Sequence, residues 1–333
     1  MGKRIRVGVI GAGRMGERHC RAYAALHGAE LVGISDLALE RGQAIAAKYG
    51  ATFYPNFREM LPHVDAVTIA TRTEMHFPVA IECLKRGIHV LIEKPLASDL
   101  EQAAELVDRA ERASLVLQVG HIERFNPAFL ELESVLEDFE IVAVGARRLS
   151  PFDTSNTEVD VVFDLMIHDL DLTLALLGDG VERVQAHGRS GRTCATDYAV
   201  ATLSMATGPM ATLTASRVTE QKVRAIEVTA LGAYVEADLL NKSICIYRRT
   251  VPEYIENHHR PLRYRQENVV ERIYIPTAEP LMLELEDFVR CVREGATPRV
   301  TGRQGLRALE LAGRIRAQIV PSAVEGTSLA AAS

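Results

Sequence analysis

The first part of the chain, to about Gly120, alternates short apolar runs rich in β-branched residues with longer stretches whose apolar positions recur at helical spacing. This alternation is typical of βαβ units, in which parallel strands are covered by helices. The predicted strands are Ile5–Ile10, Leu31–Ser35, Ala66–Ala70, His89–Ile92 and Leu115–Gly120. The clearest predicted helices are Phe77–Arg86 and Asp99–Ala113, and Ser98 with Glu101 has the spacing of a capping box for the second helix. The pattern predicts a doubly wound parallel sheet.

After Pro127 the pattern changes, and strands come to dominate. The first elements predicted are a helix near Ala128–Glu137, a strand at Ile141–Leu149 and a very apolar helix at about Asp164–Leu177. Strands with short connections, which favour antiparallel pairing, follow at Val181–His187, Tyr198–Met205, Met210–Ser216, Val223–Ala230, Tyr234–Asp238 and Ile244–Arg248. The last elements predicted are helices at about Leu281–Glu294 and Gly302–Gln318, and a frayed tail at Ala323–Ser333. We expect an α+β domain with a large, mostly antiparallel open sheet.

Length and composition are those of a folded protein with two domains. With 333 residues the chain exceeds the size that one hydrophobic core usually serves. We place an α/β Rossmann domain at residues 1–121 and a substrate-binding and oligomerisation domain at residues 122–333. The formal net charge of −6 argues against bulk nucleic-acid binding, which requires clustered positive charge.

Cysteine usage and hydropathy indicate a cytoplasmic protein. The five cysteines are scattered singly, with no Cys-x-x-Cys pair, which fits reduced thiols and provides no zinc-like spacing. Met1–Arg6 carries charge and leads straight into Val7–Ile10 and a glycine loop, so we interpret it as the start of the first strand and not as a signal peptide. Because no apolar run reaches the roughly 18 residues that a membrane helix requires, we expect no membrane association.

A glycine-rich segment, Gly11–Gly16, joins the first strand to a helix with the spacing Gly-x-Gly-x-x-Gly. Backbone N–H groups at such a helix N-terminus receive a pyrophosphate without obstruction by side chains. Asp36 ends the second strand, about 20 residues after the last glycine, where an acid binds the adenosine ribose diol. The alternative is a glycine turn beside a surface carboxylate. The predicted cofactor-binding residues are Gly11, Gly13, Arg14, Met15, Gly16, Asp36, Thr71, Glu93 and Lys94.

NAD is the predicted cofactor, in preference to NADP. The carboxylate of Asp36 accepts hydrogen bonds from a free ribose diol but repels a 2′-phosphate. Arg41 lies on the next helix, where an arginine can face a phosphate, although the ordinary role of such a residue is that of a solvated surface charge. The ribose rule therefore favours NAD.

Glu93-Lys94-Pro95 follows the fourth predicted strand, at the carboxyl edge of the sheet where open α/β folds bind their ligands. A lysine at this place can contact reacting atoms, and Pro95 restricts the local backbone. The alternative is a loop lysine in solvent, which is the usual state of a lysine. We take Lys94 as a candidate catalytic residue.

Asp164, His168 and Asp171 recur at helical spacing in the apolar helix, so we expect them to share one face. A carboxylate beside an imidazole orients the ring and makes it more basic, as a general base requires. The alternatives are a His–Asp hydrogen bond with a purely structural role and a metal site. Because no third ligand stands at a telling spacing, we predict no metal.

A basic cluster near the end of a strand contains Arg217, Lys222 and Arg224. Guanidinium and ammonium groups in such a cluster can bind a diphosphate through charge-assisted hydrogen bonds. The alternative is a solvated charged turn. We take Arg217 and Lys222 as candidate substrate-binding residues.

A second polar group, His121, Arg124 and Asn126, follows the last strand of the first domain, near the predicted domain junction. Sugar hydroxyls need paired donors and acceptors, which these side chains can supply. A structural hydrogen bond is the alternative for each of them, and Asn126 can equally cap the helix that follows. All three are candidate substrate-binding residues.

These motifs together resemble the Gfo/Idh/MocA family of dehydrogenases, and the likeness spans nearly the whole chain. The residues that carry it are the Gly11–Gly16 loop with Asp36, the motif Glu93-Lys94-Pro95, and Asp164 followed four residues later by His168. The resemblance implies that Lys94 and His168 line the reacting carbon and that Asp164 partners them. It also implies a cytosolic homodimer or homotetramer assembled through the open face of the C-terminal sheet.

Within the family, the segments Gly120–Pro127 and Ser216–Arg224 resemble bacterial UDP-N-acetylglucosamine 3-dehydrogenases. That resemblance implies oxidation of the 3-hydroxyl of a UDP-linked amino sugar to a ketone by NAD. A transaminase would then be the pathway partner, forming a 3-amino sugar for lipid A. In the expected mechanism His168 takes the hydroxyl proton, Lys94 donates a hydrogen bond to the oxygen, and Asp164 holds the group in place. Exchange of the roles of Lys94 and His168 stays open.

Two alternatives to this function stay open. Related enzymes act on UDP-sugar acids, or on free sugars and polyols, and the latter need no diphosphate site. A rival from another class is a non-catalytic NAD-binding sensor or scaffold, because a fold does not prove a function. The His- and Arg-rich segment Val251–Asn268 is interpreted as a surface loop or as an arm that reaches a neighbouring subunit.

Overall fold

The computed structural model of the chain describes residues 4–154, 157–249, 253–255, 263–265, 268–275 and 277–319. The chain divides into two compact units. The first unit comprises Met1–Asn126 and Ala278–Glu310, and the second comprises Pro127–Thr277 and Leu311–Ser333. The predicted boundary at residues 121 and 122 assigned Ala278–Glu310 to the second domain, whereas the structure groups this segment with the first unit because its helix packs against the Rossmann sheet and its helices.

The first unit is built on a six-stranded sheet with the order β3-β2-β1-β4-β5-β6, in which every pair of neighbours is parallel. The strands are β1 Ile5–Ile10, β2 Ala29–Ser35, β3 Thr52–Tyr54, β4 Ala66–Ile69, β5 His89–Glu93 and β6 Leu117–Gly120. This is the Rossmann order, so the predicted doubly wound fold is confirmed. Successive strands are added in one direction from β1 to β3 and in the other from β4 to β6, which leaves a switch point between β1 and β4.

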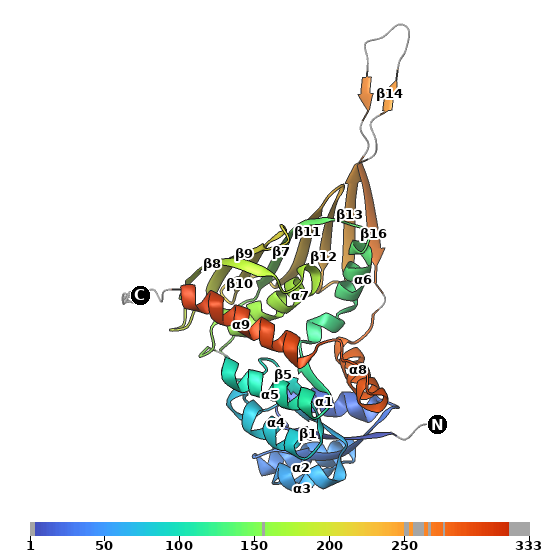
Figure 1. The fold of residues 1–333 in the computed structure, drawn as a ribbon, viewed down its shortest axis with the longest axis vertical. Helices are drawn as coiled ribbons and strands as arrows, with labels where there is room; N and C mark the ends of the chain where they lie inside the picture. The colour runs from blue at the N-terminus through green and yellow to red at the C-terminus, as the bar shows by residue number, and fades with distance from the viewer. Residues whose placement is uncertain are drawn as a thin grey trace, which may run out of the picture. The chain divides into compact units, whose positions relative to one another are not determined.

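Helices cover both faces of this sheet (Figure 1). They are α1 Arg14–Ala25, α2 Leu39–Tyr49, α3 Phe57–Met60, α4 His76–Lys85, α5 Leu100–Arg112 and α8 Pro280–Glu294, with single 3-10 turns η1 Leu61–His63, η2 Thr73–Met75 and η3 Ile122–Phe125. Because right-handed crossovers leave the switch point in opposite directions, α1 and α2 lie on one face and α4 and α5 on the other. The capping box predicted at Ser98 is wrong, since Asp99 caps α5 by accepting a hydrogen bond from the backbone N–H of Gln102 at 2.9 Å.

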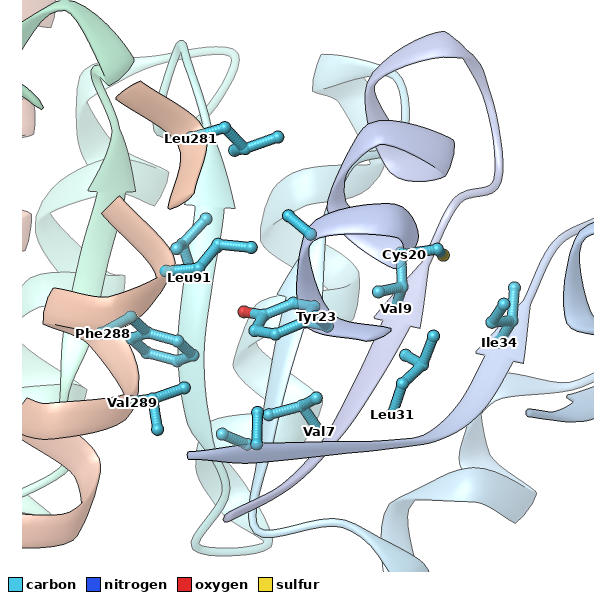
Figure 2. Packing of buried hydrophobic residues seen from close by; sticks show 14 of the residues in the cluster. Val7, Val9, Cys20, Tyr23, Leu31, Ile34, Leu91, Leu281, Phe288 and Val289 are labelled. Carbon is cyan, nitrogen blue, oxygen red and sulfur yellow. The ribbon is translucent and has the colours of Figure 1, made fainter. Parts of the chain in front are cut away.

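The core of the first unit joins β1, β2, α1 and α8 (Figure 2). Tyr23 of α1 lies at its centre, facing Leu91 of β5 and Phe288 of α8, and all three side chains are buried. The hydroxyl group of Tyr23 is satisfied by Thr68 Oγ1 at 2.8 Å, so the ring can be buried without an unpaired polar atom. The helix α8 therefore completes this core although it lies far along the chain.

The second unit contains an eight-stranded sheet with the order β16-β13-β12-β11-β7-β10-β9-β8. Its strands are β7 Ile141–Leu149, β8 Val181–Arg189, β9 Tyr198–Met205, β10 Met210–Ser216, β11 Val223–Ala230, β12 Ala233–Asp238, β13 Ser243–Arg249 and β16 Asn268–Tyr274. The pairing of β7 with β10 is parallel and all other neighbours are antiparallel, which confirms the predicted mostly antiparallel sheet.

Two helices, α6 Pro127–Leu136 and α7 Ile167–Leu177, lie against one face of this sheet (Figure 1). Burial alternates along β9 and β12, as expected for strands with one covered face. The last helix, α9 Gly302–Gln318, begins in the first unit and ends in the second. The predicted tail Ala323–Ser333 lies outside the described residues. Of the segment Val251–Asn268, the structure describes the paired strands β14 Glu253–Ile255 and β15 Arg263–Arg265 and the first residue of β16.

A buried ion pair ties α7 to β7 within the second unit. Arg148 and Asp169 are both nearly inaccessible, and the guanidinium donates to both carboxylate oxygens at 2.8 to 3.0 Å. Removing one partner of such a pair leaves a buried charge unpaired, which typically costs about 3–5 kcal/mol. This pair therefore fixes the orientation of the helix that carries His168.

Glu284 lies among the apolar residues with which α8 contacts the sheet. Its neighbours at helical spacing, Leu281 and Phe288, are buried, and Glu284 itself is 0 % exposed. Neither of its carboxyl oxygens has a hydrogen-bond partner among the described residues. Burial, and then the carboxyl groups of Glu93 and Asp287, raise the pKa of Glu284 well above its ordinary value.

We expect Glu284→Gln to stabilise the protein at neutral pH. Because the pKa of Glu284 is higher in the folded state than its unfolded value of about 4.3, folding takes up a proton. The stability linked to this group is complete below that value and is lost as the pH rises toward the folded pKa. The neutral amide of the variant does not undergo this loss. The melting temperature of the variant should therefore exceed that of the unmodified chain by an amount that increases with pH. Glu286→Gln, at an exposed position of the same helix, is the matched control; a gain that does not grow with pH would contradict the expectation.

Candidate active site

The glycine loop between β1 and α1 is closed by backbone contacts that leave no room for side chains. Gly11 has a φ of +93°, and a Cβ there would lie 2.7 Å from the carbonyl oxygen of Ala70. A Cβ on Gly16 would lie 1.8 Å from the carbonyl oxygen of Gly11. Both positions therefore require glycine.

Gly13 has the opposite surroundings. It precedes the first residue of α1, and a Cβ built on it would meet nothing within 4 Å. The space in front of the helix N-terminus is therefore open, and the free N–H groups of the first turn can bind an anion there. Close packing behind the loop and open space in front of it fit the predicted pyrophosphate site.

A cleft of about 620 Å³ lies at the switch point of the first unit, at the carboxyl ends of β1, β2 and β4. Its lining includes Gly11, Gly13, Asp36 and Thr71, four of the residues predicted to bind the cofactor. Apolar side chains line it as well, among them Leu37, Phe57, Met75 and Val79. A cleft of this composition suits an adenosine group, because an apolar wall covers the base while polar groups orient the sugar.

Two predicted cofactor residues lie elsewhere on the first turn of α1. Arg14 and Met15 line a separate hollow, together with Arg18, Arg21 and other side chains of the first unit. Their side chains therefore face away from the cleft lining, although their backbone belongs to the glycine loop. Gly16 contributes by allowing the helix to approach Gly11, as described above.

The side chain of Asp36 is buried at the end of β2 and accepts three hydrogen bonds. Its Oδ2 accepts from the backbone N–H of Ala12 at 2.5 Å, and its Oδ1 accepts from the N–H of Ala38 and from Arg41, each at 2.7 Å. A carboxylate has about four acceptor positions, so Oδ2 retains capacity for one more donor such as a ribose hydroxyl. Arg41 pairs with Asp36 in the structure, whereas the sequence favoured a solvated charge for it.

The segment Glu93-Lys94-Pro95 leaves the carboxyl end of β5 and is held by two buried histidines. His19 of α1 contacts Glu93 Oε1 through Nε2 at 2.8 Å. His76, the first residue of α4, contacts the carbonyl oxygen of Pro95 through Nδ1 at 2.8 Å. Sequence reasoning missed both histidines, and the available signal was their position on the apolar faces of their helices. Lys94 is half-buried and lies between Glu93 and Pro95, the two residues that the histidines contact.

His121 follows β6, the neighbour of β5, and is brought close to Lys94. Burial, and then the positive charges of Lys94 and Arg124, lower the pKa of His121 to about 3. The imidazole is therefore neutral at physiological pH and can both donate and accept a hydrogen bond. Asn126, also buried, donates to Glu123 Oε2 at 3.0 Å. The structure thus gathers His121, Arg124 and Lys94 in the first unit, and their contacts with substrate stay predictions.

In the second unit, Asp164 lies in η5 Val162–Met166, a π-helical turn, and His168 lies in the first turn of α7. Both side chains are partly exposed, whereas Asp171 is 2 % exposed. His168 and Asp171 lie three residues apart in α7, at neighbouring positions of one helix face, and Asp164 lies in the π-helical turn that precedes them. Such turns are frequent at functional sites. Asp164 and His168 stay candidates for catalysis.

The predicted basic cluster is mostly turned inward. Arg217 is 5 % exposed, pairs with Asp197 at 3.3 Å, and donates to the carbonyl oxygens of Val159 and Thr196. Arg224 is also buried and donates to protein oxygens near the end of β7. Of the three cluster residues, only Lys222 is exposed.

Across the part of the chain that the structure describes, no three His, Cys, Asp or Glu side chains are grouped so that they could hold a metal ion. No helix in the same residues is long and apolar enough to cross a membrane.

Models of two protein families match the chain. Residues 5–121 match the oxidoreductase family with an NAD-binding Rossmann fold, and residues 145–233 match the GFO/IDH/MocA C-terminal domain. The first match covers the glycine loop, the cleft and the Glu93-Lys94-Pro95 segment. It identifies residues 5–121 as an NAD-binding Rossmann domain, in agreement with the predicted cofactor.

Two relatives are similar over almost their whole length. The UDP-N-acetylglucosamine 3-dehydrogenase of Acidithiobacillus ferrooxidans is 35% identical over 319 residues, which is 95% of this chain and 97% of that protein. Its solved structure superposes with a TM-score of 0.86 at 34% identity and covers 96% of this chain and 98% of its own. The myo-inositol 2-dehydrogenase of Thermotoga maritima is 28% identical over 324 residues, 92% of this chain and 94% of that protein.

We expect Asp36→Asn to weaken NADH binding by about tenfold or more and to narrow the preference for NADH over NADPH. The loss follows from weaker hydrogen bonds to an uncharged acceptor, and the narrowing follows because a neutral amide no longer repels a 2′-phosphate and frees Arg41. Fluorescence titrations with both reduced cofactors measure the two affinities. Asp108→Asn, at an exposed position of α5, is the control. An unchanged ratio of the two affinities would show that Asp36 does not select the cofactor.

Proposed function

The chain belongs to the Gfo/Idh/MocA family of oxidoreductases, and we propose that it oxidises the 3-hydroxyl of UDP-N-acetylglucosamine to the 3-keto sugar nucleotide with NAD. The observation that carries this proposal is the 35% identity, over 95% of the chain, to a UDP-N-acetylglucosamine 3-dehydrogenase. The cofactor cleft and the Glu93-Lys94-Pro95 segment support the oxidoreductase part of the proposal independently.

A bound NAD would supply the hydride acceptor for the reaction. The residues that fit it are the loop Gly11–Gly16, whose open helix N-terminus suits a pyrophosphate, and Asp36, whose carboxylate suits a ribose diol. Asp36 is already paired with Arg41, so the cleft offers a carboxylate rather than a free guanidinium to the ribose. This arrangement supports NAD over NADP.

We propose that His168 takes the proton of the sugar hydroxyl, that Lys94 donates a hydrogen bond to the developing oxyanion, and that Asp164 holds the group in place. Lys94 is half-buried near the neutral His121, so water competes less for its ammonium group than at an open surface. The exchanged roles of Lys94 and His168 stay open, because a lysine crowded by positive charge can act as the base.

Two finer parts of the proposal rest on the family resemblance. The product, a 3-keto sugar, would be consumed by a transaminase that makes a 3-amino sugar for lipid A. The protein would act as a homodimer or homotetramer. Lys222 supports a diphosphate contact better than Arg217 or Arg224, because its side chain is exposed and theirs are engaged by protein oxygens.

The direct test of the substrate is NADH formation, followed by its absorbance, with the purified protein, NAD and UDP-N-acetylglucosamine. A transaminase specific for 3-keto sugars is added to remove product if the equilibrium opposes oxidation. We expect NADH to form only when the UDP-sugar is present. Signal with myo-inositol or a UDP-sugar acid instead would keep the family and overturn the substrate, and tight NADH binding without turnover on any of them would favour a sensor.

Lys94→Ala and His168→Ala, made separately, test the catalytic assignment. General acid–base and electrostatic groups each contribute roughly 10²–10⁴-fold, so we expect each variant to lose about that factor in kcat while it still binds NADH. Lys85→Ala, at an exposed position of α4, is the control for loss of a positive charge. Nearly normal turnover in both Lys94→Ala and His168→Ala would refute the assignment.

A further inference from the structure

The segment that carries Lys94 is held from both faces of the Rossmann sheet. His19 reaches Glu93 from α1, and His76 reaches Pro95 from α4. The two helices lie on opposite faces, and both imidazoles are almost fully buried, at 0 % and 1 % exposure. Lys94 is the residue between the two anchored positions, so the anchors set the path of its backbone.

The ring of His76 faces two carbonyl oxygens that belong to two different loops. Its Nδ1 lies 2.8 Å from the oxygen of Pro95, and its Nε2 lies 3.2 Å from the oxygen of Thr71, in the loop that lines the cofactor cleft. Burial lowers the pKa of His76, against the opposing effect of these two carbonyls, so the imidazole is neutral and has a single N–H. A neutral ring can donate to only one of the two oxygens.

The two distances decide which bond is made. The separation of 2.8 Å is at the short end of the range for an N–H···O hydrogen bond, whereas 3.2 Å is at its long end. The proton therefore belongs on Nδ1, where it is shared with Pro95. The carbonyl of Thr71 then faces the lone pair of Nε2 and gains nothing from it.

We propose that His76 is a positioning residue for Lys94, whose backbone it fixes by donating Nδ1–H to the carbonyl of Pro95. This inference rests on the proposed catalytic role of Lys94 and deepens it, because it explains how a lysine on a loop keeps one position. The side chain of His76 reaches a backbone carbonyl rather than reacting atoms. It acts on the reaction through the lysine next to Pro95.

Two substitutions at the same position, H76N and H76Q, separate the two ring nitrogens. The amide nitrogen of the shorter side chain in H76N is attached at the same distance from the backbone as Nδ1. The longer side chain in H76Q carries its amide nitrogen to the place of Nε2. H76N therefore keeps a donor for Pro95, and H76Q exchanges it for a donor to Thr71.

We expect H76Q to lose about tenfold to a hundredfold in kcat, the cost of a catalytic group displaced by roughly 1 Å, with the Kd for NADH changed by no more than about twofold. H76N should retain kcat within about threefold of the unmodified chain. H27Q, at an exposed histidine of the first unit, is the matched control and should change neither value. Titration with NADH reports on folded molecules, so it separates a displaced lysine from a loss of fold.

Equal losses in H76N and H76Q would overturn the proposal, because a purely structural histidine does not distinguish its two nitrogens in kcat. Retention of kcat by H76Q together with its loss in H76N would also overturn it, since the important bond would then be the one to Thr71. A change in Kd for NADH with unchanged kcat would place His76 in cofactor binding and would contradict a role in positioning Lys94.

A readout without substrate separates this proposal from the proposed function. The rate at which acetic anhydride modifies Lys94, relative to the exposed Lys48, is measured by mass spectrometry in the folded protein. H76Q should raise that ratio because the released segment exposes Lys94, and H76N should leave it unchanged. If UDP-N-acetylglucosamine is not turned over but the ratio rises in H76Q alone, the proposed substrate is wrong and the proposed role of His76 in positioning Lys94 is supported. An unchanged ratio in H76Q refutes the positioning whatever the substrate is.

Discussion

The pairing of β1 with β2 on one side and with β4 on the other determines where the first unit can form a binding cleft. Val7 and Val9 of β1 are fully buried, so this strand is the fixed centre of the sheet. Because the connection after β1 and the connection after β4 run to opposite sides of the sheet, they separate at the carboxyl ends of these two strands. The chain must also turn sharply after Ile10, and only a segment without side chains at Gly11 and Gly16 can do so at the distances observed. The cleft at this edge is a consequence of these two requirements.

Three buried polar groups lie near the Glu93-Lys94-Pro95 segment. His19, His76 and Glu284 are each at most 1 % exposed, although imidazole and carboxyl groups lose hydration when they are buried. For the histidines, hydrogen-bonding contacts of 2.8 Å offset part of the lost hydration. For Glu284 the raised pKa favours the neutral, protonated carboxyl group, which loses less hydration on burial than a carboxylate does. Burial displaces the pKa values of His76 and Glu284, and groups with displaced pKa values gather at functional sites. Their location is consistent with a functional site at this segment.

Periodicity predicted nearly every buried strand, because one or two covered faces impose a pattern on the residues themselves. The strands that were missed lack that constraint. The strands β3, β14 and β15 are three residues long each, and β16 is an edge strand with Val269 and Val270 exposed. The glycine loop and Asp36 were recognisable because local geometry dictates residue type there.

Long-range partners left no such trace in the sequence. His19 contacts a carboxylate 74 residues away in the chain. His76 contacts a backbone carbonyl, a group that every residue has, so the sequence does not mark this partner. Arg217 looked available for a ligand because its partner Asp197 lies just before a neighbouring strand and the contact depends on the folded sheet.

The first unit is itself assembled from distant parts, since α8 returns to it after the whole sheet of the second unit. During synthesis Tyr23 and Leu91 therefore lack the cover of Phe288 until α8 has been translated, so the core of the cofactor-binding half is completed only after the strands of the second unit have been made.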